Sequence, residues 1–158
     1  MTVCILKAAL VALTNLTIAQ ASHNSRNDSA LYPDFAALMQ MAGDDLDWKA
    51  FEATSDDGYI TTLWRITGTN GARSPRESPR GPILLQHGIW SDAQSWMERS
   101  DSTSAALPVK LFNLGFDVWI ANGRGTTYSS GHTTLNAEID NDYYDYCFVE
   151  QAVMDLPA

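Results

Sequence analysis

The segment from Pro82 to Ile89 carries the residues best suited to contribute to a reaction. An apolar run from Pro82 to Gln86 predicts a buried strand, and His87 and Gly88 follow it directly. In acyl transfer, negative charge develops on a carbonyl oxygen, and backbone N–H groups aimed at that oxygen stabilise the transition state. Glycine lets a backbone approach closely, so that the next amide can point into a pocket. The backbone N–H of Ile89 is therefore the candidate oxyanion-hole donor, supported by His87 and Gly88.

No residue that would make and break an acyl bond is identified beside this turn. The chain contains no Gly-x-Ser-x-Gly, the usual setting of a nucleophilic serine. His87 is interpreted as packing under the loop, because a general base needs an activated nucleophile within reach and a carboxylate behind it. His132 lies close to Ser129 and Ser130, but sequence neighbours rarely reach nucleophile–base geometry, and a structural role is predicted. No catalytic residue is assigned within this chain.

Neither a metal site nor a cofactor is predicted. One segment does concentrate side chains with oxygen atoms that could bind calcium: Glu138, Asp140, Asn141, Asp142 and Asp145. It lacks the glycine and the terminal glutamate of a calcium-binding loop. A solvated acidic start to the following helix, where negative charge favours the helix dipole, is the better interpretation.

The composition indicates one acidic domain, or part of one. The chain has 158 residues, 45% of them hydrophobic, with 10 Lys and Arg against 19 Asp and Glu. A chain of this length builds one core rather than two. The excess of negative charge argues against a nucleic-acid partner and against charge-driven binding to an anionic membrane.

The N-terminal segment is typical of a secretory signal. Lys7 gives a positive start, an apolar stretch follows, and Ala-Gln-Ala at 19–21 offers a small-x-small cleavage site. Such a segment is too short to span a bilayer. We therefore predict a signal peptide over 1–21, a flexible mature N-terminus over 22–30 with a glycosylation sequon at Asn27, and a secreted protein. The alternative is an amphipathic N-terminus that frays.

Cysteine usage is compatible with export. Cys4 would leave with the signal, so that Cys147 alone would remain in the mature chain. Either Cys147 is a small buried hydrophobe, or its disulfide partner lies beyond Ala158.

Hydrophobic periodicity and turn residues predict alternating strands and helices. The predicted elements are a helix over 32–41, strands over 48–54 and 59–67, a loop over 68–81, a strand over 83–86, a helix over 104–114, a strand over 116–121, a structured loop reaching 131, and a helix over 143–154. The first two strands should form a hairpin that turns at Asp57-Gly58. The two later strands are apolar throughout and separated by a helix, which is typical of parallel strands covered on both faces. Asp155 and Pro157 are typical of a further helix start.

Together these segments resemble the acid lipase family of α/β hydrolases, which includes gastric and lysosomal lipases. The resembling motifs are Asp-Gly-Tyr-Ile at 57–60, Leu-Leu-Gln-His-Gly-Ile at 84–89, the run from Gly115 to Ser129, and Asp-Leu-Pro-Ala at 155–158. Their order and spacing agree with the family over residues 31–158. Ile89 stands where the family usually has leucine, and Cys147 stands where serine is usual.

The resemblance implies an α/β fold, namely the N-terminal portion of an α/β hydrolase with an antiparallel hairpin leading into a mostly parallel sheet with flanking helices. It implies hydrolysis of triacylglycerols or sterol esters by a Ser-Asp-His triad, in a secreted, lysosomal or vacuolar protein. The triad would lie beyond Ala158, so the 158 residues alone are expected to be inactive. The alternative is a non-catalytic secreted binding or interaction protein that keeps the lipase start.

The same fold order implies that the strand before His87 lies beside the strand that carries the nucleophile. Without that neighbour, we expect the 83–86 strand to form a sheet edge. Unpaired N–H and C=O groups along an apolar edge favour self-association.

Overall fold

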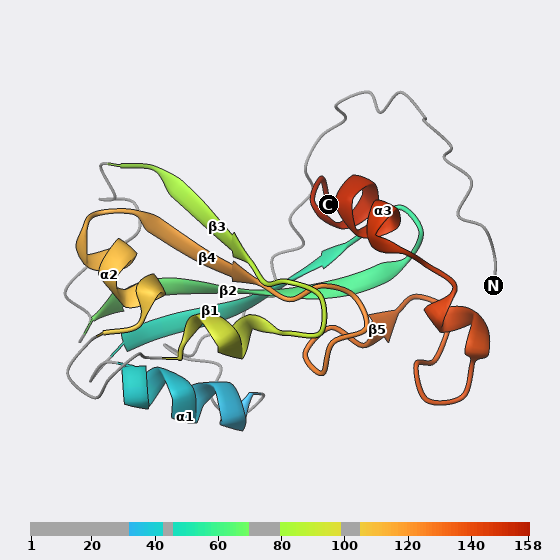
Figure 1. Cartoon of the computed structure of the whole chain (residues 1–158), viewed down its shortest axis with the longest axis horizontal. Coiled ribbons are helices and arrows are strands. Elements are labelled where there is room, and N and C mark those ends of the chain that lie inside the picture. Colours follow the sequence, from blue (N-terminus) through green and yellow to red (C-terminus); the bar gives the residue numbers. More distant parts are fainter. Residues whose placement is uncertain (1–31, 43–45, 70–79, 99–104) are drawn as a thin grey trace.

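The computed structural model describes residues 32–42, 46–69, 80–98 and 105–158 and shows a mixed sheet with short flanking helices (Figure 1). The strands are β1 (Leu46–Thr54), β2 (Tyr59–Thr69), β3 (Pro82–Gln86), β4 (Asp117–Ala121) and β5 (Gly131–His132). The helical segments are α1 (Pro33–Ala42), η2 (Ala93–Trp96), α2 (Leu107–Asn113), η3 (Asn141–Tyr144), α3 (Phe148–Glu150) and η4 (Gln151–Asp155). The predicted signal peptide, the segment with Asn27, and most of the 68–81 loop lie outside the described residues.

The predicted hairpin is confirmed. β1 and β2 pair antiparallel over their full lengths, with one register irregularity between Asp47 and Trp48. Gly58 closes the turn with a φ of +96°, and its N–H donates to the Ser55 carbonyl over 2.9 Å. A Cβ at position 58 would lie 2.5 Å from Thr133 Oγ1, so both the backbone conformation and the space require glycine here.

The sheet has the strand order β1-β2-β4-β3, and β5 pairs with the start of β2. β4 runs antiparallel to β2 and parallel to β3, with Ile83 opposite Val118 and Leu85 opposite Ile120. In Figure 1, β3, β4, β2 and β1 follow one another across the molecule. Because β3 and β4 are parallel, their carboxyl ends meet at one edge, where open α/β sheets bind ligands. Among the described strands, β3 pairs with β4 alone, as the edge prediction required.

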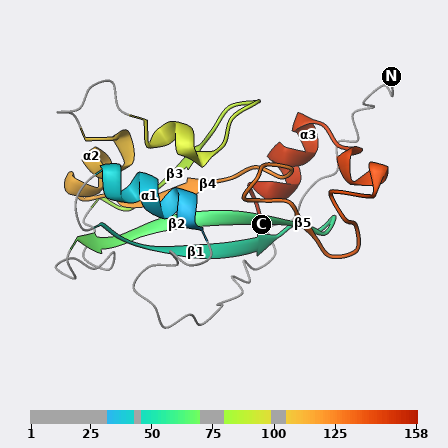
Figure 2. The same cartoon turned by 90° about the horizontal axis from the view of Figure 1, so that it is seen from below.

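The core lies on one face of the sheet, beneath α1 and α2. Figure 2 shows both helices on the same side of β1 and β2. Trp64 and Ile120, opposite each other in β2 and β4, are at most 1% exposed, and Phe35 of α1 and Phe112 of α2 pack into the same cluster. The Phe35 ring stacks on Trp64 with centroids 3.5 Å apart. The alternating apolar residues of the hairpin thus bury one face of the sheet, as the period of two predicts.

The opposite face carries a second, smaller aromatic cluster. Phe51 and Trp119 lie 5.1 Å apart between ring centroids, and Arg65 lies over Trp119 while it forms a salt bridge of 2.8 Å with Asp117. Leu84 of β3 continues this face and is 46% exposed. This face is therefore only partly covered by the described residues.

The predicted helix over 143–154 is correct only in part, because the chain is helical up to Tyr144 and from Phe148 onward but not between them. η3 ends at Tyr144, and Asp145 adopts a ψ of 57°, outside the helical region. Cys147 is extended, and its N–H donates to Glu150 Oε2 over 2.9 Å, which starts a new helix at Phe148. A capping interaction between residues three apart thus competes with the hydrophobic periodicity of the segment.

Two other boundaries differ from their predictions. α2 begins at Leu107 rather than at 104, with Pro108 in its first turn, where a missing N–H costs no hydrogen bond. β2 extends to Thr69 and thus takes up the start of the predicted 68–81 loop. The short strand β5, inside the predicted structured loop, forms by pairing Gly131 and His132 with the hairpin.

Candidate functional site

Two loops meet where β3 and β4 end. The β3 loop contains His87, Gly88 and Ile89, and the β4 loop runs from Asn122 to Ser129. The Gly123 N–H donates to His87 Nε2 over 2.9 Å, and the Asn122 side chain accepts the Ala93 N–H over 3.1 Å. Gln94 also donates to the Tyr128 hydroxyl. The parallel pairing of the strands therefore brings both loops together at the edge where a ligand is expected.

Ile89 lies on the rim of an open pocket of about 1420 Å³ at this edge. Its side chain is 73% exposed, and that of Trp90 is fully exposed. Trp90 has a φ of +65°, an unusual conformation for a bulky residue and one that concentrates at functional sites. The pocket is also lined by Leu84 of β3 and by Phe148 near the C-terminus. An apolar group presented here would lie beside the backbone of the β3 loop.

No described residue lies close enough to Gly88 to require glycine at this position. A Cβ at this position would meet no described atom within 4 Å, and its φ is not in the left-handed region. The close backbone approach predicted for this glycine therefore has no counterpart in the contacts of the loop itself.

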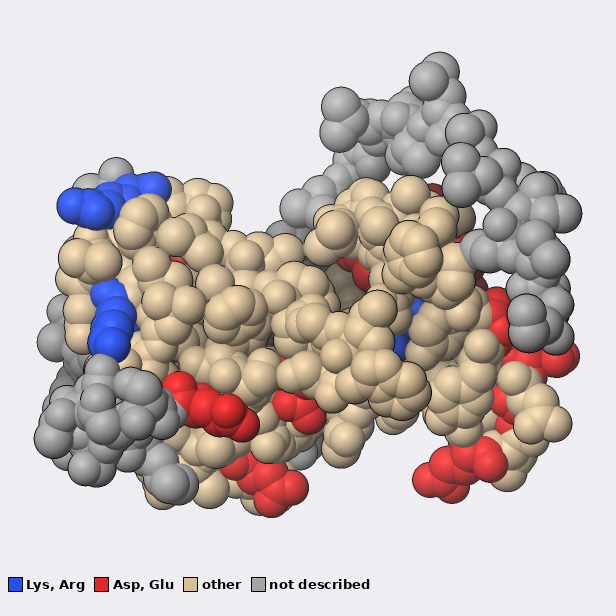
Figure 3. All heavy atoms as spheres, viewed as in Figure 1, with Lys and Arg blue, Asp and Glu red and all other residues tan. Residues whose placement is uncertain are grey.

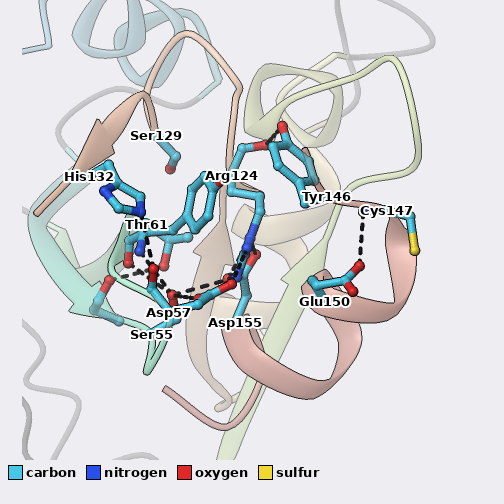
Figure 4. Close-up of polar contacts among 12 residues, drawn as sticks. Ser55, Asp57, Thr61, Arg124, Ser129, His132, Tyr146, Cys147, Glu150 and Asp155 are labelled. Atoms are coloured by element: carbon cyan, nitrogen blue, oxygen red, sulfur yellow. Dashed lines mark hydrogen bonds and ion pairs between the residues drawn. The ribbon is translucent and has the colours of Figure 1, made fainter. Parts of the chain in front are cut away.

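Arg124, in the β4 loop, lies at the centre of a buried ionic cluster that sequence analysis did not single out (Figure 4). Its side chain has no exposed surface. Nη1 and Nη2 donate to the two carboxylate oxygens of Asp57 over 2.6 and 3.0 Å, and Nε donates to Asp155 over 3.0 Å. The guanidinium lies 3.9 Å from the ring centroid of Tyr59 and 5.4 Å from that of Tyr146. Arg124 thereby joins the hairpin turn, the β4 loop and the C-terminal turn.

Asp155 takes part in this cluster, and the helix start predicted from Asp155 and Pro157 stays a prediction, because that helix would follow Ala158. Asp155 is the last residue of η4, and its carboxylate is committed to Arg124. The sequence signal for this cluster was a single arginine between Gly123 and Gly125 directly after a buried strand. At position 125, φ is +78°, and a Cβ would lie 2.1 Å from the Tyr146 hydroxyl. A glycine is thus required for Tyr146 to pack against the loop.

Ionisation within the cluster favours fixed charges rather than proton transfer. Burial alone would raise the pKa of Asp57, but the hydrogen bonds from Arg124 and Ser55 outweigh it and hold that pKa below its ordinary value. Burial opposes the charged form of Arg124, yet Asp155 and Asp57 raise its pKa above the usual range. Because the pKa of Asp57 is lowered, its stabilising contribution is present at neutral pH and is lost as the pH falls through that lowered value.

The other sequence candidates take structural positions. The Thr134 and Leu135 N–H groups both donate to His132 Nδ1 over 3.0 Å, and its Nε2 lies 3.0 Å from the Asp57 carbonyl. Cys147 is half-buried at the start of α3. In the described ranges, no group of three or more His, Cys, Asp or Glu is placed to hold a metal ion. No described helix is both long and apolar enough to cross a membrane.

The surface around these elements is acidic, in keeping with a net charge of −9. On the face seen in Figure 3, acidic side chains gather along the lower and right-hand margins, and basic ones are few. The pocket rim beside the β3 loop is instead mainly apolar at Ile89, Trp90 and Leu84.

Comparison with known proteins shows which family the chain resembles. Residues 41–100, which include β1, β2 and β3 with the His-Gly turn, match the partial alpha/beta-hydrolase lipase region. The mouse protein Lipase member M is 38% identical over 108 residues, which cover 68% of this chain and 25% of that protein. Triacylglycerol lipase 1 of Arabidopsis thaliana is 39% identical over 100 residues, which cover 63% of this chain and 24% of that protein. The human lysosomal acid lipase/cholesteryl ester hydrolase is 36% identical over 104 residues, which cover 66% of this chain and 25% of that protein.

Over the matched residues, the chain is similar to the N-terminal part of α/β-hydrolase acid lipases. The resemblance found from the motifs of the hairpin, the β3 loop and the β4 loop is thus confirmed. The chain spans about a quarter of the length of the curated relatives that it matches. In this chain, β3 is the outermost described strand beside β4, and the candidate oxyanion turn follows it.

Proposed function

We propose that this chain is the N-terminal region of a carboxylic-ester lipase that acts on triacylglycerols or sterol esters. The observation that supports the proposal is that Ile89 lines a largely apolar pocket at the carboxyl edge of β3 and β4. The names of two relatives, triacylglycerol lipase and cholesteryl ester hydrolase, support an ester of a lipid as the substrate. In this proposal Ile89 supplies one oxyanion donor, and the nucleophile, acid and base come from sequence after Ala158.

The first prediction concerns activity. The 158-residue chain should not hydrolyse p-nitrophenyl butyrate above the buffer rate, because it has no Gly-x-Ser-x-Gly to form an acyl-enzyme. A longer native protein containing this chain should hydrolyse the ester and should react with a fluorophosphonate probe at a serine after Ala158. Peptide mass spectrometry of the native protein identifies the labelled serine. Turnover by the 158 residues alone would contradict the proposal that the nucleophile, acid and base lie after Ala158. A native protein without any esterase activity would favour the non-catalytic binding protein.

We also propose a secreted or lysosomal location. The support is the predicted signal peptide over 1–21, the sequon at Asn27, and relatives whose names place them in lysosomes or tears. Substrate binding in this proposal depends on the apolar pocket rim, since the acidic surface offers little attraction to anionic lipids.

The second prediction concerns the edge formed by β3. Produced alone, the 158 residues should self-associate, because β3 pairs on one side only among the described strands and Leu84 is 46% exposed. Leu84→Lys should lower the oligomer fraction in size-exclusion chromatography with light scattering, since a lysine on an edge strand opposes pairing. Leu107→Lys is the matched control, because Leu107 is 43% exposed but lies on α2. Equal effects of the two substitutions, or a monomeric parent chain, would contradict the prediction that the β3 edge causes self-association.

A further inference from the structure

The imidazole of His87 is fixed by hydrogen bonds at both nitrogens. The Gly123 N–H donates to Nε2 over 2.9 Å, so Nε2 must hold a lone pair rather than a proton. Nδ1 lies 2.8 Å from the Gly88 carbonyl oxygen, and a carbonyl oxygen can only accept. Nδ1 must therefore be the donor, and the ring is neutral with its proton on Nδ1.

This arrangement orients the peptide bond between Gly88 and Ile89. In a planar trans peptide, the C=O and the N–H point in opposite directions, and no described peptide bond is cis. The Gly88 oxygen is held against the His87 ring, so the Ile89 N–H of the same peptide unit is turned away from that ring. Rotation of this peptide plane would break the contact between Nδ1 and the Gly88 oxygen.

The partner of His87 is itself held firmly by the sheet. Asn122, which precedes Gly123, is 1% exposed. Its backbone N–H donates to the Thr62 carbonyl over 3.0 Å, and its side-chain Nδ2 donates to the same carbonyl over 3.2 Å. The Asn122 side-chain oxygen also accepts the Ala93 N–H, which fixes the far end of the β3 loop. The His87 ring therefore ties a loop of exposed residues to a buried anchor.

We propose that His87, in its Nδ1–H form, is the positioning residue that aims the Ile89 N–H at the developing oxyanion. This deepens the proposed function and depends on it for the identity of the group that Ile89 contacts. His87 itself touches neither the reacting atoms nor a nucleophile. It acts through the Gly88–Ile89 peptide, and its anchor is the Gly123 N–H.

Ring ¹⁵N NMR of the longer native protein at neutral pH tests the protonation pattern directly. His87 should show the Nδ1–H tautomer, whereas His132 should show the Nε2–H tautomer, because its Nδ1 accepts two backbone N–H groups and its Nε2 faces the Asp57 carbonyl. The two histidines should thus show opposite tautomers in one spectrum, so that each serves as a reference for the other. An Nε2–H or doubly protonated ring at His87 would overturn the proposal.

Two substitutions then separate anchoring from peptide orientation. The side-chain amide of His87→Asn can replace the Nδ1–H donor but is too short to reach Gly123, whereas His87→Ala removes both contacts. Both variants should shift the Gly123 amide signal, but only His87→Ala should shift that of Ile89. Because the Asn variant keeps the Gly88 contact, an unmoved Ile89 signal in the Ala variant would overturn the positioning role.

Kinetics of the longer native protein supply the functional readout. Loss of one oxyanion-hole donor typically lowers kcat on the order of 10²-fold, with KM little changed. We expect a fall of this kind for His87→Ala, partial rescue for His87→Asn, and no effect for His132→Asn on kcat. An active protein in which His87→Ala retains kcat would overturn the proposal. A native protein that is inactive while the NMR pattern holds would instead refute only the proposed lipase function.

Discussion

Replacing Arg124 with methionine is expected to lower the free energy of unfolding by about 3–5 kcal/mol. The guanidinium is completely buried and donates to the carboxylates of both Asp57 and Asp155. Methionine fills a similar volume but leaves those carboxylates facing each other without a cation. Urea unfolding followed by circular dichroism measures the change as a shift of the midpoint.

Arg65→Met is the matched control for this substitution. Arg65 also binds a carboxylate, that of Asp117, and also lies over an aromatic ring, that of Trp119. The Arg65 side chain is 27% exposed, so water already screens this ion pair and weakens it. We expect a loss of about 1 kcal/mol or less. Equal losses at the two arginines would show that burial of the Arg124 cluster does not set its strength.

A second comparison tests the cause of the loss at Arg124. Adding Asp57→Asn and Asp155→Asn to Arg124→Met removes the two carboxylates that the first substitution left unpaired. The triple variant should therefore recover part of the lost stability, because an uncompensated buried charge costs more than a neutral amide. If the triple variant were less stable than Arg124→Met, lost packing rather than unpaired charge would account for the effect.

The parts of the fold that sequence analysis predicted well are those governed by local pattern. The alternation from Tyr59 onward indicated β2, and Asp57-Gly58 indicated its turn, because side-chain period and glycine conformation are properties of neighbouring residues. The apolar runs of β3 and β4 likewise indicated parallel strands. These predictions were confirmed because the local preference and the tertiary packing agree.

The Arg124 cluster was missed because its partners are remote. Asp57 lies 67 residues before Arg124 and Asp155 lies 31 residues after it, so no window of sequence contains the three together. The helix over 143–154 was only partly correct for a different reason. There the spacing of apolar residues was helical, but the contact between Cys147 and Glu150 and the non-helical Asp145 interrupted it. The helix was predicted from hydrophobic periodicity alone, without the competing capping interaction between Cys147 and Glu150.

The core should respond most strongly at Trp64, and Trp64→Ala is expected to lower the free energy of unfolding by about 3–5 kcal/mol. The indole is 1% exposed and contacts the rings of Phe35, Trp48 and Tyr128. It therefore joins α1, the hairpin and the β4 loop, and alanine would leave a cavity between three elements. Urea unfolding monitored by circular dichroism gives the loss, and a shift of less than 1 kcal/mol would contradict the placement of this ring at the centre of the core.

Trp64→Phe distinguishes lost volume from lost polarity. The Trp64 Nε1 atom is buried and has no hydrogen-bond partner among the described residues, so phenylalanine removes an unsatisfied donor while it keeps most of the ring. The loss for Trp64→Phe should be well below that for alanine, because the gain from removing the donor offsets part of the smaller volume. A loss as large as that for alanine would mean that Nε1 has a partner whose hydrogen bond the phenylalanine variant breaks. The indole would then be held by a hydrogen bond as well as by packing.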